Sequence, residues 1–114
     1  AIAVEVDVEG IDERLDGAQR ASVLRIVQEA LQNVRKHAAA SRVSIGVEGD
    51  ALVIADNGRG FDVIRLAAGA RRNFGLQFMR ERAELMGGQL QIESRQGEGT
   101  RILLRLPAAQ VVSR

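Results

Sequence analysis

The segment LVIADNGRGF, residues 52–61, joins an apolar strand to a glycine-rich loop and decides how the rest of the chain is arranged. Residues 52–55 are apolar without alternation, a pattern typical of a strand that is covered on both faces. Asp56 follows directly, and Gly58 and Gly60 then prevent a helix or a strand from continuing. A covered strand that ends on a carboxylate and opens into glycines is therefore the centre around which we place the other elements.

Alternation of apolar and polar residues predicts the other strands of the sheet, each buried on one face. The Gly49–Asp50 pair predicts a tight hairpin before residues 52–55, and the segment QGEG, residues 96–99, predicts a turn before the last strand. Pro107 closes that last strand. The alternating apolar positions are Ile2, Val4, Val6 and Val8, ended by Gly10; Val43, Ile45 and Val47; Leu90 and Ile92; and Ile102, Leu104 and Leu106.

Two amphipathic segments predict helices. The first runs from about residue 17 to about residue 38, with Asp16 as N-cap and Gln19 as its capping-box partner. The second carries Leu76, Met79, Ala83 and Met86 on one face and ends at Gly87–Gly88. The fold class we expect is α+β, a two-layer sandwich of about five mostly antiparallel strands covered by two long helices. Residues 1–107 form this domain, and residues 108–114 form a tail.

Composition excludes several classes of protein. The 114 residues suffice for one domain, and a net charge of +1 argues against a protein that holds nucleic acid by its positive field. The absence of Cys excludes disulfides and thiolate metal sites. The sequence has no P-loop, G-x-S-x-G, H-E-x-x-H or protein-kinase motif and no apolar run of about 20 residues. Because it lacks an initiator Met, we expect a piece of a longer protein.

One strip of the first helix combines an acid, an amide and a cation. Glu29, Asn33 and Lys36 fall within about 60° of one another at helical spacing, and His37 follows. Carboxylate and amide oxygens are hard ligands that suit Mg²⁺, and a lysine neutralises phosphate oxygens. A solvated helix face is the other explanation of this strip, which alone does not decide between them.

Three further clusters suit a nucleotide. Asp56 at the end of a covered strand needs a donor, such as an adenine amino group, and its glycines admit a flat ring. The segment NFGL, residues 73–76, enters a helix whose N-terminal N–H groups suit an anion. In the segment GEGT, residues 97–100, Thr100 offers a hydroxyl. A capped turn, a loop-to-helix junction and a hairpin turn explain the same three clusters without any ligand.

Read together, these clusters resemble the ATP-binding domain of sensor histidine kinases, within the wider GHKL superfamily of gyrase, Hsp90 and MutL. Residues 25–38 resemble the N box and residues 56–61 the G1 box. Residues 75–83, with Gly87–Gly88, resemble the second glycine box, and residues 97–100 the hairpin before the final strand. The segments RKHA, residues 35–38, and MRERA, residues 79–83, are most similar to those of the subclass of nitrate and cell-envelope-stress sensors. The resemblance covers residues 1–107 and implies the Bergerat-type ATP-binding fold.

The resemblance also implies site residues. Asp56 binds the adenine amino group, helped by a water near Thr100, while residues 62–74 form an ATP lid. Asn33 and Glu29 are the implied catalytic and metal-binding residues, and Glu29 either activates a nucleophile or only supports Mg²⁺. The implied nucleotide-binding residues are Asn33, Lys36, His37, Asp56, Gly58, Gly60, Phe61, Gly75, Leu76 and Thr100.

The implied function is that of the catalytic domain of a two-component sensor histidine kinase, which binds Mg-ATP and donates the γ-phosphoryl to a histidine on a separate dimerisation domain. The expected partners are those upstream helices and a response regulator, without nucleic acid. The parent is expected to be a homodimer, and the isolated domain a cytoplasmic monomer that transfers little. The alternatives are a GHKL ATPase, an anti-sigma-type serine kinase, or a degenerate interaction domain.

Overall fold

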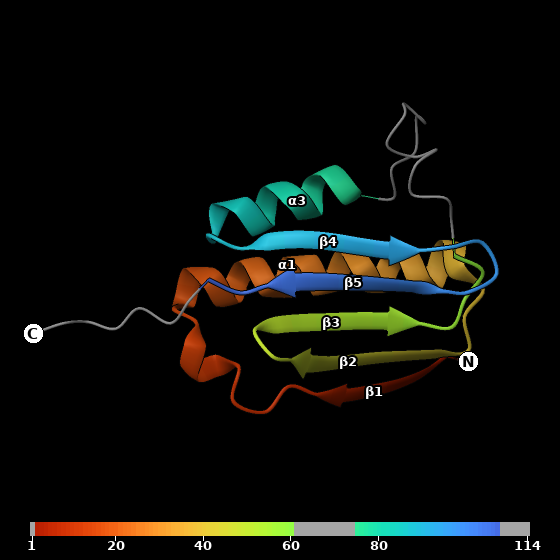
Figure 1. Cartoon of the computed structure of the whole chain (residues 1–114), viewed down its shortest axis with the longest axis horizontal. Coiled ribbons are helices and arrows are strands. Elements are labelled where there is room, and N and C mark those ends of the chain that lie inside the picture. The colour runs from red at the N-terminus through yellow and green to blue at the C-terminus, as the bar shows by residue number, and fades with distance from the viewer. Residues whose placement is uncertain (1, 61–74, 108–114) are drawn as a thin grey trace, which may run out of the picture.

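The strands form a single mixed sheet in the computed structural model, which describes residues 2–60 and 75–107 (Figure 1). The described sheet has five strands in the order β1-β2-β3-β5-β4. β1 runs parallel to β2, and every other neighbouring pair is antiparallel. The expected mostly antiparallel sheet is therefore confirmed. The strands are β1 (Ala3–Asp7), β2 (Arg42–Glu48), β3 (Ala51–Asp56), β4 (Gln89–Ser94) and β5 (Thr100–Arg105).

The helices begin and end close to the predicted positions. A 3-10 turn, η1 (Asp12–Arg14), precedes α1 (Gly17–Asn33), and α3 spans Leu76–Leu85. The capping box at the start of α1 is present: Gln19 N–H donates to Asp16 Oδ1 at 2.8 Å, and Asp16 N–H donates to Gln19 Oε1 at 2.9 Å. The first helix continues to residue 38 as expected, but its last turn, η2 (Val34–Ala38), is a π-helix rather than an α-helix.

The hydrophobic core lies between the sheet and the helices, which makes the described part of the chain a two-layer structure. In Figure 1, α1 runs behind the strands, across the face that carries Leu52, Ile54 and Leu104. Met79 and Ala83 of α3 are completely buried against the same core. The helical spacing of the apolar residues is thus explained, because each helix packs one stripe of apolar side chains against the sheet.

Strand β1 departs from the expected burial. Alternation predicted that Val4 and Val6 would be buried, but they are 52% and 60% exposed. β1 is the edge strand at the far side of the sheet from β4 and α3, and an apolar groove of about 210 Å³ separates Val6 from the side chains of Val23 and Leu24 on α1. The alternation therefore predicted the strand correctly, but α1 runs alongside β5 behind the sheet and leaves the edge strand β1 uncovered (Figure 1).

Strand β3 is buried on both faces as predicted, although no described helix covers its second face. Val53 points to that face and is only 5% exposed. The side chains of Arg101 and Glu48 form an ion pair at 2.8 Å. Because the register places them beside Ala55 and Ala51, this pair crosses diagonally over Val53. The Arg101–Glu48 ion pair thus covers the face of β3 on which no described helix lies.

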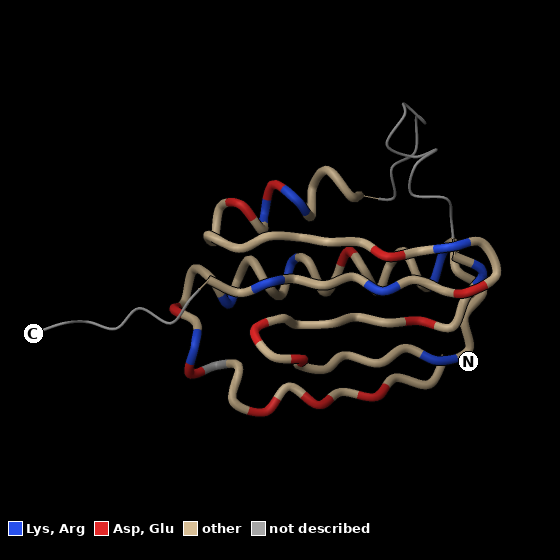
Figure 2. Tube along the Cα trace, in the orientation of Figure 1, with Lys and Arg blue, Asp and Glu red and all other residues tan. Residues whose placement is uncertain are grey.

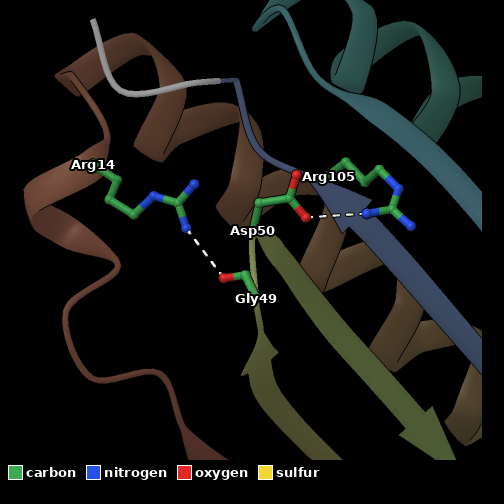
Figure 3. A network of polar contacts seen from close by, with 4 residues as sticks. All are labelled: Arg14, Gly49, Asp50 and Arg105. Atoms are coloured by element: carbon green, nitrogen blue, oxygen red, sulfur yellow. Dashed lines mark hydrogen bonds and ion pairs between the residues drawn. The ribbon is translucent and has the colours of Figure 1, made fainter. Parts of the chain in front are cut away.

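Polar contacts hold the turn between β2 and β3 (Figure 3). Arg105 Nη1 bonds to Asp50 Oδ1 at 3.0 Å, and Arg14 Nη1 donates to the Gly49 carbonyl at 3.5 Å. Leu106 N–H also donates to the Asp50 carbonyl at 2.9 Å. These side-chain contacts are exposed and stabilise the fold little, but they fix this turn at the end of the sheet opposite to the β4–β5 hairpin (Figure 1).

Charges of both signs are interspersed along the described chain, apart from an acidic run along β1 (Figure 2). Glu5 and Asp7 belong to this run. No described helix is long and apolar enough to span a membrane. The predicted tail, residues 108–114, lies outside the described residues, as does the predicted lid.

Candidate functional site

The predicted site residues gather at one end of the sheet. Asp56 ends β3 and pairs directly with Thr100, the first residue of β5. Strand alternation puts both side chains on the face that also carries Leu52 and Leu104, which is the face covered by the helices. The end of the first helix, the start of α3 and the β4–β5 hairpin lie at the same end of the molecule (Figure 1). The sheet thus places a carboxylate and a hydroxyl side by side at the end of the core.

Asp56 is held by backbone donors. Gly58 N–H donates to Asp56 Oδ1 at 2.8 Å, and the backbone of Thr100 also bonds to the carboxylate. Burial raises the pKa of the Asp56 carboxyl above its ordinary value of 3.8, and these two hydrogen bonds offset part of the rise. Since a carboxylate has about four acceptor sites, Asp56 keeps acceptor capacity for a further N–H donor.

The raised pKa predicts a cost in stability at neutral pH. The protonated form of Asp56 is favoured in the folded state, so the stabilisation linked to this group is present at low pH and is lost as the pH rises above 3.8 through the folded-state pKa. We expect Asp56→Asn, which cannot ionise, to gain stability relative to the parent as the pH rises. Thermal melts of both proteins from pH 4 to pH 8 measure this gain. A difference in melting temperature between the two proteins that stays constant with pH would contradict this prediction.

The glycines after Asp56 are required by close packing within the protein. A Cβ at Gly58 would collide with the backbone of Ala38 at the end of the first helix. A Cβ at Gly60, where φ is +64°, would collide with the carbonyl oxygens of Arg95 and Gly99. The loop therefore passes between the helix end and the β4–β5 hairpin, with no room for side chains at these positions.

Arg59, which lies between the two glycines, joins these neighbours and was missed by sequence reasoning. Its N–H donates to the Ala38 carbonyl at 2.7 Å, and its Nε donates to the His37 carbonyl at 2.6 Å. Its own carbonyl accepts from Gly97 N–H at 2.5 Å. Cationic side chains commonly bond to the last carbonyls of a helix. An arginine between the two glycines of this loop could therefore have been predicted to bond to a helix end.

We expect Arg59→Ala to loosen the contact between the helix end and the hairpin. Loss of the side-chain bond to His37 costs about 1 kcal/mol of unfolding free energy, which urea denaturation measures. The local effect is faster hydrogen exchange at Gly97 N–H, because its acceptor is the Arg59 carbonyl. Arg105→Ala, which removes an exposed ion pair at the other end of the sheet, is the control. If both variants exchange alike at Gly97, Arg59 does not hold the loop.

Helix α1 and helix α3 bring two other predicted residues together. A Cβ on Gly75, the N-cap of α3, would collide with Oε1 of Glu29. The half-buried Glu29 carboxylate therefore lies directly against the backbone at the start of α3. Sequence segments 46 positions apart, which resembled the N box and the second glycine box, are thus neighbours in the fold.

The π-helical turn changes the predicted helix strip. Asn33 is the last residue of α1 and is half-buried, whereas Lys36 lies in η2 and is exposed. A π turn holds more residues than an α turn, so the helical angle that predicted Lys36 above Glu29 does not apply there. The backbone of His37 is engaged by Arg59. Glu29 and Asn33 therefore lie one turn apart on the α-helix, whereas Lys36 follows them within a π turn.

The start of α3 presents backbone donors near Glu29. Gly75 has a φ of +71° and provides no side-chain cap, and the adjacent Leu76 is buried. The first N–H groups of a helix have no acceptor within the helix, and the anionic group that lies against this terminus in the structure is the Glu29 carboxylate. Phe61, Asn73 and the predicted lid, residues 62–74, lie outside the described residues.

The donor set suits a magnesium ion shared with a substrate. Among the described residues, no three His, Cys, Asp or Glu side chains cluster as a metal site. Mg²⁺ is commonly held by one or two protein oxygens and completed by phosphate oxygens and water. Glu29 and Asn33, one helical turn apart on α1, offer a carboxylate and an amide oxygen and therefore fit that arrangement.

Comparison with known proteins identifies relatives of the chain. Residues 18–110 match the family described as histidine kinase-, DNA gyrase B-, and HSP90-like ATPase. A signal transduction histidine-protein kinase/phosphatase, DegS of Brevibacillus brevis, is 41% identical over 86% of this chain. The sensor histidine kinase LiaS of Bacillus subtilis is 36% identical over 93% of the chain. The chain spans 26% and 29% of the length of these two relatives.

Solved structures share the fold. A blue-light activated histidine kinase from Erythrobacter litoralis superimposes with a TM-score of 0.76 at 24% identity, covering 96% of this chain and 36% of that one. The ATP binding domain of PrrB from Mycobacterium tuberculosis gives a TM-score of 0.65 at 25% identity, covering 91% of this chain and 79% of that domain. The expected α+β architecture is therefore one that ATP-binding domains adopt.

Proposed function

The chain belongs to the family of histidine kinase-, DNA gyrase B-, and HSP90-like ATPases, and from that premise we propose that it is the ATP-binding catalytic domain of a two-component sensor histidine kinase. The relatives named as histidine kinases favour this function over an ATPase or a serine kinase. The observation that carries the proposal is the Asp56 carboxylate, half-buried at the end of the core and held by backbone donors beside Thr100.

Asp56 and Thr100 bind the adenine. The ionised Asp56 accepts a hydrogen bond from the 6-amino group, and Thr100 adds a hydroxyl on the same face of the sheet. Gly58 and Gly60 let the loop lie close to the helix end and the hairpin, so the carboxylate stays fixed at the edge of the core. The adenine end of the site is therefore rigid and requires little ordering when the nucleotide binds.

Glu29, Asn33 and the start of α3 bind the phosphates. The Asn33 amide oxygen and the Glu29 carboxylate hold Mg²⁺, which when bound neutralises the charge of the phosphate oxygens. Gly75 and Leu76 donate backbone N–H groups to a phosphate, and Lys36 and His37 add positive charge or donors at the rim.

Transfer of the γ-phosphoryl takes place to a histidine on a separate dimerisation segment of the parent kinase. His37 is the only histidine of the chain, and its backbone is tied to Arg59 within the site. We therefore assign it to the pocket and not to the acceptor. The domain contributes position and charge neutralisation, which are the main terms in phosphoryl transfer. Its partners are the dimerisation helices of a homodimeric, cytoplasmic kinase core and a response regulator.

Titration of the chain with ATP, with and without Mg²⁺, tests the proposal. The protein should bind ATP, and a supplied histidine-bearing dimerisation segment should become phosphorylated. Absence of ATP binding by the folded domain contradicts the assigned function and favours a degenerate interaction domain. Binding followed by hydrolysis, or by phosphorylation of serine, favours the other GHKL activities.

We expect Asn33→Ala to weaken the contribution of Mg²⁺ to ATP binding without weakening the binding of the adenine. The variant should lose most of the Mg²⁺-dependent gain in ATP affinity, because one metal ligand is missing, while it binds ATP without metal like the parent. Mg²⁺-dependent phosphorylation of the supplied acceptor segment should fall about 10- to 100-fold. Gln32→Ala, at the exposed neighbouring position of α1, is the control. Equal responses of the two variants to Mg²⁺ would remove the metal role of Asn33.

A further inference from the structure

Ser94, at the end of β4, lies next to the adenine end of the site but has no role in the function proposed above. The strand register aligns Ser94 with Thr100 and Thr100 with Asp56, so the three residues form a row across β4, β5 and β3. The hydroxyl oxygens of Ser94 and Thr100 are 2.8 Å apart. Thr100 is 8% exposed, so the packing around it restricts the rotation of its side chain.

The hydrogen bonds of Ser94 fix the direction of this hydroxyl pair. Ser94 Oγ donates to the Gly99 carbonyl at 3.1 Å. A serine hydroxyl has one proton, so the two bonds of Ser94 are formed together only when Thr100 is the donor between the hydroxyls. Thr100 then donates its hydroxyl proton to Ser94. Toward any other partner, the Thr100 oxygen can only accept a hydrogen bond. Ser94 thereby makes Thr100 an acceptor.

We propose that Ser94 is a positioning residue that holds the Thr100 hydroxyl as an acceptor and so selects purine nucleotides with an amino group at position 6. The inference rests on the proposed function, in which Asp56 and Thr100 bind the base. An amino group has two N–H donors, which suit a carboxylate and a lone pair side by side. A 6-oxo purine presents an acceptor there, and two acceptors face each other without a proton between them.

Two substitutions of equal size isolate the hydroxyl. Ser94→Thr keeps it and Ser94→Val removes it, and β-branched residues suit a strand in both cases. The measurement is the ratio of the dissociation constants for inosine triphosphate and ATP, with thermal melts to show that each variant is folded. We expect Ser94→Thr to keep the parent ratio and Ser94→Val to reduce it about 3- to 10-fold, because Thr100 can then turn its proton toward the 6-oxo group. Ser44→Ala, on β2 and the opposite face of the sheet, is the control.

A double substitution shows whether Ser94 acts through Thr100. In a Thr100→Val background, Ser94→Val should leave the ratio unchanged, since the hydroxyl that it orients is absent. An equal loss of affinity for both nucleotides in Ser94→Val, or the same ratio in Ser94→Val and Ser94→Thr, overturns the inference and leaves Ser94 a structural role. Failure of the parent protein to bind ATP is a different result, which overturns the proposed function itself.

Discussion

ATP binding by the Asp56→Ala variant is expected to be about 10- to 150-fold weaker than that of the parent protein, equivalent to about 1.5–3 kcal/mol. The substitution removes the charged acceptor of the adenine amino group, so one N–H of that group is then buried without a partner. It also removes the acceptor of Gly58 N–H, so the loop after β3 loses a bond. Calorimetric titration with ATP measures the loss.

Asp50→Ala is the matched control for this prediction. Asp50 also flanks β3, at its other end, and forms an exposed ion pair with Arg105 (Figure 3). This variant should bind ATP like the parent, because Asp50 lies away from the β4–β5 hairpin end of the sheet (Figure 1). Unchanged ATP affinity in a folded Asp56→Ala protein would refute the assignment of Asp56 to the adenine.

A large loss of stability is expected for Gly99→Ala. At Gly99, φ is +80° and a Cβ would collide with the backbone carbonyl of Asp56. The variant therefore combines backbone strain with a steric clash that only a shift of β3 or β5 relieves, and we expect it to lose about 3 kcal/mol or more of unfolding free energy. Urea denaturation measures this loss.

Gly97→Ala separates strain from the clash. Gly97 lies in the same hairpin with a φ of +85°, but a Cβ there would meet nothing within 4 Å. We expect this variant to lose only about 1–2 kcal/mol, from backbone strain alone. Similar losses in the two variants would mean that the contact between the hairpin and Asp56 adds nothing to the stability of the fold.

Local patterns in the sequence predicted most of the fold because the interactions behind them are also local. The capping box of Asp16 and Gln19 is formed within four residues, and the end of α3 follows from Gly87, which adopts a φ of +81°. The clusters of the candidate site were found in the same way. Asp56 ends β3, Gly75 precedes α3 and Thr100 begins β5, while Glu29 and Asn33 were found by their helical spacing.

What the sequence did not predict depends on contacts between distant segments. The exposure of Val4 and Val6 is decided by which strands α1 lies against, and no alternation within β1 encodes that. The position of Lys36 depends on a π turn whose end carbonyls are bonded by Arg59, 22 residues away from His37. The contact of Ser94 with Thr100 requires the register of β4 and β5. Such interactions become visible only when the chain is folded.

The wide last turn of the first helix affects how sequences of this kind should be aligned. A π turn takes up about one residue more than an α turn. A related protein whose helix stayed regular throughout would reach the same end point one residue sooner. It would therefore need a single-residue gap between positions 34 and 38 to keep the carbonyl of residue 37 opposite the loop arginine. A short insertion or deletion at this place in a family alignment thus marks a change in helical winding and not an error of register.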